Sequence, residues 1–183
     1  MKLISERDER AAMPPAWLRF GASAVAVAGA AFAGGRAVDA DSVWYRTLPK
    51  PSWQPPSWAF GVVWTPLYAT IAYAGGRASG AAPTGAERRR LAASMAVNLS
   101  LNAGWNWLFF RMRSPRASLA GTVLLDLSNA ELIRRTARSD RTAARILLPY
   151  AAWCMFATAL NGSIVRQSSR APALSRAVRV PQP

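Results

Sequence analysis

Residues 91–110 read LAASMAVNLSLNAGWNWLFF, twenty consecutive positions without a charged side chain. A run of about 20 apolar or small residues crosses the roughly 30 Å hydrocarbon core of a bilayer as one helix. Asn98, Asn102 and Trp105 fall on one stripe of that helix, at spacings of four and three residues. An amide that faces lipid is costly, so this stripe must face the interior of a helix bundle. The segment therefore predicts a membrane helix with a polar inner face.

A second stripe on the same segment consists of small residues only. Ala92, Ala96, Ser100 and Gly104 recur every four residues on another face of the helix. Small residues at this spacing let helix backbones approach closely in lipid. We expect this face to dock against another helix.

Four more apolar stretches flank this one, at about 16–35, 57–76, 117–133 and 146–165. None alternates in the ten-residue pattern of a membrane strand, and only helices then satisfy the backbone in lipid. We predict an all-α membrane protein, a five-transmembrane-helix bundle over residues 16–166. An N-terminal tail (1–15) precedes it and a flexible C-terminal tail (167–183) follows. The stretch 117–133 carries the weakest signal, because Asp126 and Glu131 lie inside it, with Arg134 or Arg135 as possible partners.

The stretch 16–35 has a second interpretation as a cleaved signal peptide. Basic residues precede the apolar run, and Ala31-Phe32-Ala33 is similar to a signal-peptidase site. Acidic residues in the same leader and the length of the run favour a retained helix. Basic residues are divided almost equally between the two sides of the predicted bundle, so the positive-inside rule does not predict its orientation.

The net charge of +14 and the mean hydropathy of +0.06 also suit a soluble nucleic-acid-binding protein. The arginines, however, lie between the apolar stretches and in the tails, where they reach lipid headgroups. We therefore predict membrane lipid as a partner and no nucleic acid. The chain has no histidine and one cysteine, Cys154. Histidine-dependent metal or triad chemistry is thus disfavoured, and we predict no metal site and no catalytic residue.

The first loop, residues 44–58, has four prolines within positions 49–56, three tryptophans and a tyrosine. Prolines stiffen such a segment, and amphipathic aromatic rings suit the membrane–water interface. Two interpretations stay open: an interfacial belt on an ordered linker, or a rigid lid over a cavity between helix ends.

Aromatic residues also mark two further helices. Trp64 and Tyr68 are four apart on one face, and Trp153, Ala157 and Asn161 follow at i, i+4 and i+8. A small residue one turn from a tryptophan makes a notch beside a flat wall, which suits a planar ligand or a neighbouring helix. The same two interpretations, packing or ligand binding, hold for Asn98 and Asn102.

These residues carry a resemblance to the TspO/MBR family, the translocator proteins or peripheral-type benzodiazepine receptor homologues, and to its bacterial-type members. It covers about residues 44–166 and rests on three motifs. They read Trp44-Tyr45-x-x-Leu48-x-Lys50-Pro51-x-Trp53-x-Pro55-Pro56-x-Trp58 with Trp64-Thr65-x-Leu67-Tyr68, Asn98-x-x-x-Asn102-Ala103-x-Trp105-x-Trp107, and Pro149-Tyr150-x-x-Trp153-x-x-Phe156-Ala157-Thr158-x-Leu160-Asn161.

The resemblance implies a five-helix bundle, often dimeric, with a cavity roofed by the first loop. It implies porphyrin or haem as the ligand, with no obligatory cofactor, and a multi-pass protein of the bacterial cell membrane. The small-residue stripe would then serve a homodimer. The ligand-binding residues carried over by position are Trp53, Trp64, Tyr68, Asn98, Asn102, Trp105, Trp153 and Ala157.

The expected function is porphyrin or haem binding for sensing, sequestration or transport. Two alternatives stay open: photo-oxidative porphyrin degradation, as attributed to some bacterial relatives, and a sterol- or lipid-binding carrier or scaffold. Two departures matter. Gly162 stands where the sterol-recognition segment of animal members has a tyrosine, and Thr122 stands where many members have an acid. Sterol binding at the fifth helix is therefore not expected.

Overall fold

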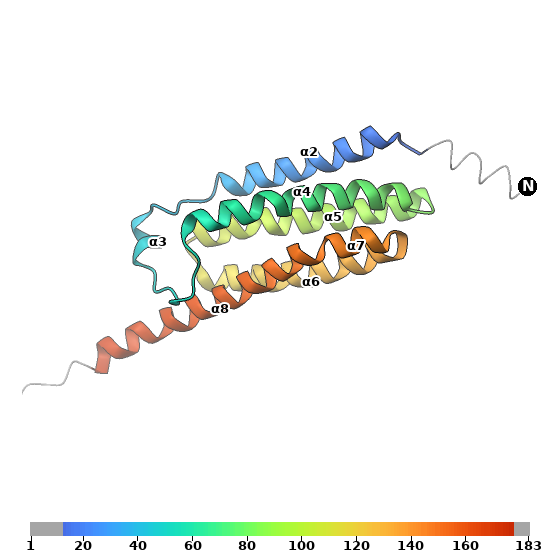
Figure 1. Ribbon diagram of the computed structural model, residues 1–183. Helices are drawn as coiled ribbons and strands as arrows, with labels where there is room; N and C mark the ends of the chain where they lie inside the picture. The colour runs from blue at the N-terminus through green and yellow to red at the C-terminus, as the bar shows by residue number, and fades with distance from the viewer. Residues whose placement is uncertain (1–12, 178–183) are drawn as a thin grey trace, which may run out of the picture.

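The computed structural model describes residues 13–177, which form a bundle of helices (Figure 1). Five helices are long: α2 (Ala16–Gly35), α4 (Ser57–Ala81), α5 (Gly85–Asn106), α6 (Pro115–Ser139) and α8 (Leu148–Ala177). Three short segments connect them: α3 (Val43–Thr47), the π-helical turn η1 (Trp107–Arg111) and α7 (Arg141–Ile146). No strand occurs among the described residues. The predicted all-α class is confirmed.

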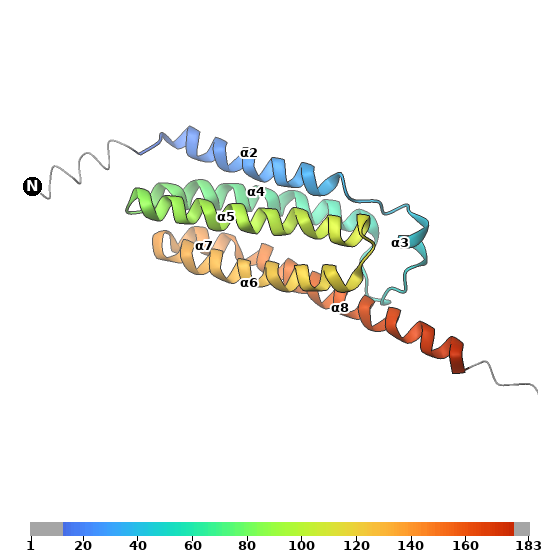
Figure 2. The ribbon, with the colours of Figure 1, turned by 180° about the vertical axis from the view of Figure 1, so that it is seen from behind.

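The long helices lie roughly along one axis (Figures 1 and 2). Helix α2 packs on α4 and α5, while α6 packs on α5 and α8. The chain between α2 and α4, with α3 at its centre, crosses one end of the bundle. We call residues 36–56 the lid.

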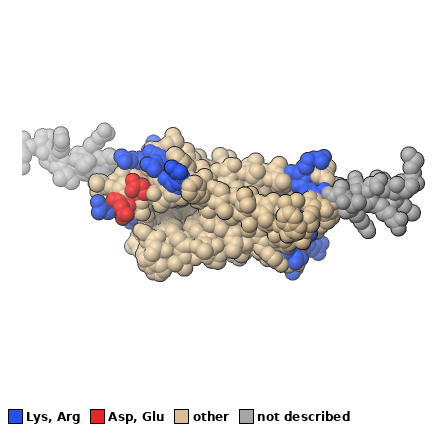
Figure 3. All heavy atoms as spheres, turned by 90° about the horizontal axis from the view of Figure 1, so that it is seen from above, with Lys and Arg blue, Asp and Glu red and all other residues tan. Residues whose placement is uncertain are grey.

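Charged side chains lie at the two ends of the molecule, and the middle of the face in Figure 3 shows none. Large exposed apolar side chains occupy outer helix surfaces, among them Val25, Val62, Val97 and Leu127. Two helical segments, Ala16–Gly35 and Arg141–Ser169, are long and apolar enough by themselves to cross a membrane.

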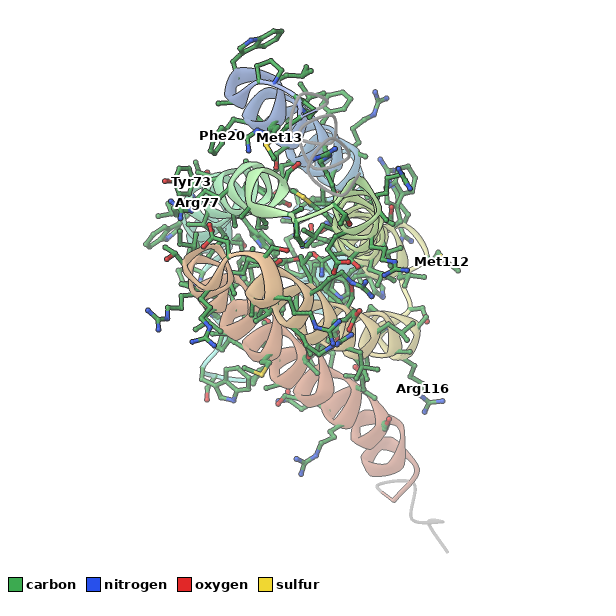
Figure 4. The ribbon with its side chains drawn as sticks, turned by 90° about the vertical axis from the view of Figure 1, so that its right-hand side faces the viewer. Met13, Phe20, Tyr73, Arg77, Met112 and Arg116 are labelled. Atoms are coloured by element: carbon green, nitrogen blue, oxygen red, sulfur yellow. The ribbon has the colours of Figure 1, made fainter. Side chains whose placement is uncertain are left out.

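Close packing of α2 against α4 depends on glycine. A Cβ atom at Gly76 would overlap the ring of Phe20, and one at Gly75 would overlap Ser23 and Met95. Figure 4 shows Phe20 on α2 and Tyr73 on α4 at the end of the bundle that faces the viewer, with their ring centroids 5.6 Å apart. Small residues therefore bring the two backbones together, as is typical of packed membrane helices.

The predicted regular helix over 91–110 needs a correction at its end. Helix α5 stops at Asn106, and the next turn is π-helical, with the Met112 N–H donating to the Trp107 carbonyl at 2.9 Å. Arg113 then adopts a left-handed backbone (φ 50°) that ends the turn. The Ser114 hydroxyl accepts the Ala117 N–H and starts α6, with proline at the first helical position.

The fourth and fifth helices are longer than predicted. Helix α6 extends past 133 to Ser139, and Glu131 pairs with Arg134 and Arg135 on its surface. Asp126 accepts the Thr158 hydroxyl of α8 at 2.6 Å. Helix α8 continues to Ala177, past the predicted start of the C-terminal tail at 167. The flexibility of that tail stays a prediction. Residues 1–12 of the predicted N-terminal tail and 178–183 of the C-terminal tail lie outside the described residues.

Candidate functional site

A cavity of about 390 Å³ lies beneath the lid, between α4, α5 and α8 and next to the end of α2. We call it the lid cavity. Its size falls within the range of small-molecule sites. It is lined by Ala31, Gly35, Val38, Ala40, Tyr45, Gln54, Ser57, Phe60, Gly61, Trp64, Tyr68, Trp105, Asn106, Phe109, Phe110, Ala157, Leu160, Asn161 and Ile164.

Two stacked aromatic pairs form flat walls of the lid cavity. Trp64 and Tyr68 of α4 stack with centroids 5.1 Å apart, because they are one turn apart on the same helix face. Trp105 stacks on Phe109 at 5.4 Å, with an interplanar angle of 18°. Ala157, one turn before Asn161 on α8, leaves room beside these rings. The cavity can therefore accept a flat apolar body.

Three polar atoms of residues in the cavity wall are buried without a hydrogen-bond partner in the described structure. They are Trp105 Nε1, Asn161 Nδ2 and Gln54 Oε1, which amount to two donors and one acceptor. A buried polar group without a partner costs about 1–3 kcal/mol. The carbonyl oxygen of Asn161 is in contact with Ser118 Oγ at 3.2 Å, so its amide is already oriented. A ligand with matching polar groups could recover these costs.

The lid is held over the cavity by its own polar contacts. Gln54 Nε2 donates to the Tyr45 hydroxyl at 3.1 Å, and burial raises the pKa of Tyr45 although this hydrogen bond lowers it. Lys50 donates to the carbonyls of Tyr45, Arg46 and Leu48. Its ammonium lies 4.4 Å from the centre of the Tyr45 ring, and burial lowers the pKa of Lys50. The lid is therefore an ordered structure, closed on itself, and Tyr45 packs on Phe109 and Phe110 of η1.

Beneath the cavity, a hydrogen-bond network joins four helices. Tyr68 donates to Asn102 at 3.2 Å, and Asn102 donates to the Tyr150 hydroxyl at 3.3 Å. Tyr150 donates to Asn98 at 2.9 Å, and Asn98 donates to Asn129 at 2.7 Å. Asn98 and Asn102 are buried. These amides therefore hold α4, α5, α6 and α8 together, whereas only Tyr68 of this network reaches the cavity.

The eight predicted site residues divide into two groups. Trp64, Tyr68, Trp105 and Ala157 line the cavity. The other four do not: Asn98 and Asn102 lie in the network below, Trp153 packs on Phe60 and Phe156, and Trp53 packs edge-on against Phe156 with 48% of its surface exposed.

Some lining residues lie outside the predicted set. Asn161 continues the stripe of Trp153 and Ala157 at the same spacing, so the helical period alone could have found it. Tyr45 and Gln54 belong to the proline-rich lid, where no regular period relates a position to a direction. Phe109 and Phe110 belong to the π-helical turn, which rotates them from the positions that a regular helix would give.

Comparison with known proteins agrees with this architecture. The sequence model of the TspO/MBR family matches residues 22–166. The chain belongs to the TspO/MBR family. This confirms the resemblance, and it makes the chain a membrane protein of that family.

Characterised TspO/MBR relatives match over most of their length. "Tryptophan-rich protein TspO" of Chlorobaculum tepidum is 37% identical over 139 residues, covering 74% of this chain and 86% of the relative. The "Translocator protein" of Homo sapiens is 31% identical, covering 85% and 94%. The "Tryptophan-rich sensory protein" of Cereibacter sphaeroides is 31% identical, covering 70% and 79%. The family match over residues 22–166 includes every residue that lines the lid cavity.

Proposed function

We propose that the lid cavity binds a tetrapyrrole, a porphyrin or haem, for sensing, sequestration or transport. The observation that carries this proposal is the set of three unpaired polar atoms among stacked aromatic walls. A tetrapyrrole presents a flat apolar ring to the stacked pairs. Its carboxylates would accept from Trp105 Nε1 and Asn161 Nδ2, and a ring or acid N–H or O–H would donate to Gln54 Oε1.

The test is a titration of the purified full chain in detergent with protoporphyrin IX, followed by quenching of tryptophan fluorescence. Ala157→Phe places a ring in the cavity and should weaken binding at least tenfold, because the ligand and the ring compete for one space. Ala159→Phe is the matched control, since Ala159 is exposed on the same helix and does not line the cavity. It should leave the affinity within about twofold.

Equal affinities for the wild type and both variants would show that porphyrin binds elsewhere. A sterol that binds with the same dependence on Ala157, while protoporphyrin does not bind, would replace the tetrapyrrole with a sterol as the ligand of this cavity.

We further propose that α2, α4, α5, α6 and α8 each cross the membrane, so the chain is a multi-pass protein, and that this membrane is the bacterial cell membrane. Support comes from the charges at the two ends in Figure 3 and from the family. Pairing of two copies through Ala92, Ala96, Ser100 and Gly104 stays a prediction. The first three are exposed, and a Cβ atom at Gly104 would meet nothing within 4 Å. Cross-linking of the protein in membranes would test it.

A further inference from the structure

A second cavity, of about 490 Å³, lies at the opposite end of the bundle from the lid, where α2 begins, α4 ends and α5 begins. We call it the basic-end cavity. Residues of α2, α4 and α5 form most of its wall, with Leu132 and Thr136 of α6 and Leu147 behind them. It has no lining residue in common with the lid cavity. It is therefore a separate space with no role in the site described above.

The wall of this cavity changes from cationic to apolar along its length. Among the described residues that line it, the charged ones are Arg19, in the first turn of α2, and Arg88, in the first turn of α5. Ala26 and Ala96 lie seven and eight residues beyond these arginines, and Leu99 lies eleven residues beyond Arg88. At about 1.5 Å per residue, the apolar wall extends roughly 10–16 Å from the arginines. A cationic end and a long apolar end suit an anionic group that carries an acyl chain.

Arg19 and Arg88 are not among the four arginines that form ion pairs in the described part of the chain. Arg77 pairs with Asp140, Arg90 with Glu87, and Arg134 with Glu131. No carboxylate in the described part of the chain forms an ion pair with Arg19 or Arg88. Among the described residues 13–177, no carboxylate therefore balances these two cations on the cavity wall.

Arg19 is also held in place rather than free to turn to water. Its Nε is buried without a partner in the described structure. Its guanidinium lies against the backbone of Gly80 at the end of α4, where a Cβ atom would overlap it. An arginine at a helix end ordinarily extends its guanidinium into the headgroup layer. Here, packing on Gly80 keeps the guanidinium at the cavity.

We propose that the basic-end cavity binds an anionic phospholipid of the surrounding membrane, with one acyl chain along the apolar wall and its phosphate between Arg19 and Arg88. Guanidinium groups bind phosphate through paired charge-assisted hydrogen bonds. Headgroup phosphates lie at the level of helix ends, where both arginines are. Ala22 of α2 is small and exposed at the rim and is not part of the stripe predicted to pair two copies, so a chain can enter from the bilayer there without an opening movement.

The experiment counts lipids retained by the full chain in native mass spectrometry, after release from detergent that contains phosphatidylglycerol or phosphatidylcholine with identical chains. The wild type should retain phosphatidylglycerol preferentially. Arg19→Ala with Arg88→Ala should lower its retention about 25-fold, roughly fivefold for each arginine, and should leave phosphatidylcholine unchanged. Arg89→Ala with Arg138→Ala removes the same charge at the same end from exposed residues outside the cavity, and should change retention less than about twofold.

A second variant tests the apolar wall. Ala96→Leu keeps both arginines and fills the chain-binding part, so it should lower phosphatidylglycerol retention without exposing new charge. Protoporphyrin affinity should stay within about twofold in all these variants, since none lines the lid cavity. That readout also shows that each variant is folded.

Equal retention of the two lipids by the wild type would overturn the proposal, as would equal losses in the two double-arginine variants. Displacement of phosphatidylglycerol by millimolar inorganic phosphate would instead indicate a site for a free anion. Retention of palmitate as strong as that of phosphatidylglycerol would indicate a fatty-acid site. Either outcome would overturn the assignment to a phospholipid.

Discussion

Buried polar side chains in this molecule differ in whether their hydrogen bonds are already made. Both the oxygen and the nitrogen of Asn98 are engaged, with Tyr150, Ser128 and Asn129. Trp105 Nε1 is buried and has no partner in the described structure. The first arrangement stabilises the bundle, and the second leaves a donor for something that enters the cavity. Substitution of one residue from each group separates these roles.

Asn98→Ala should destabilise the bundle and leave porphyrin binding nearly unchanged. Loss of the amide strands the Tyr150 hydroxyl and the Asn129 amide, at a cost of about 1–2 kcal/mol. We expect a lower melting temperature in detergent, with a protoporphyrin affinity within about twofold of wild type. Ser100→Ala, at an exposed position of the same helix, is the control and should change neither. A weaker affinity at an unchanged melting temperature would make Asn98 a ligand contact after all.

Trp105→Phe should weaken protoporphyrin binding about threefold to tenfold, which is the range for one hydrogen bond worth about 1 kcal/mol. Phenylalanine retains one flat ring against Phe109 and removes the Nε1 donor together with the second ring of the indole. Trp58→Phe is the matched control, because Trp58 is 71% exposed and outside the cavity. Both variants are titrated with protoporphyrin IX. An equal effect of the two substitutions would show that the Trp105 N–H does not contact the ligand.

Among the secondary-structure elements, the joint between α6 and α7 is held by a single carboxylate. Asp140 Oδ1 accepts the Ala143 N–H at 2.9 Å as the N-cap of α7, and Oδ2 accepts Arg77 Nε of α4 at 3.0 Å. The Ala143 N–H, together with Arg77, holds the pKa of Asp140 below its ordinary value of 3.8. Asp140, which directly follows α6, therefore connects α7 to α4 at the end of the bundle away from the lid.

Asp140→Asn should lower the melting temperature at neutral pH by a few degrees, because asparagine keeps the cap and loses the ion pair. The pKa of Asp140 in the folded state lies below that in the unfolded state. The ionised carboxylate therefore stabilises the folded state fully above pH 3.8, the unfolded-state pKa. This stabilisation disappears as the pH falls through the lower pKa of the folded state. Melting curves of both proteins should converge at acid pH. A gap that persists at about pH 2 would show that the amide disturbs packing instead.

A sequence pattern predicts which face of a helix is buried, but not which residues of that face reach the cavity. The stripe of Asn98, Asn102 and Trp105 does face the interior, as predicted. Its ends are about 10 Å apart along the helix, so only Trp105 reaches the cavity. For the same reason Trp153 lies on the predicted side of α8 but packs on Phe60 and Phe156. Period alone does not show where one layer of side chains ends and an open space begins.

For the whole molecule, hydropathy indicates fewer membrane-crossing helices than the positions of the charged residues do. Within residues 13–177, two segments, Ala16–Gly35 and Arg141–Ser169, are long and apolar enough on their own to indicate membrane crossing. Helix α5 falls short because asparagine, serine and small residues dilute its apolar side chains, and α6 because Asp126 and Glu131 lie within it. Arginines gather at the ends away from the lid, where Arg88–Arg90 begin α5 and Arg134–Arg138 end α6. Asp126, in the middle of α6, is satisfied by Thr158 of α8 rather than facing lipid. The positions of the charges therefore support the proposal that these helices cross the membrane.

Crossing by all five long helices predicts which connections share a side of the membrane, whatever the orientation. We expect cysteines at Ser52 in the lid and Arg113 before α6 to be labelled from one side. Cysteines at Ala86 and Thr142, at the opposite end, should be labelled only from the other side. The background carries Cys154→Ser, since Cys154 is buried and the only native cysteine. An impermeant maleimide applied to sealed vesicles, and again after permeabilisation, gives the result. Labelling of positions 52 and 86 from the same side would mean that α4 does not cross, and a shared side for 113 and 142 would mean the same for α6.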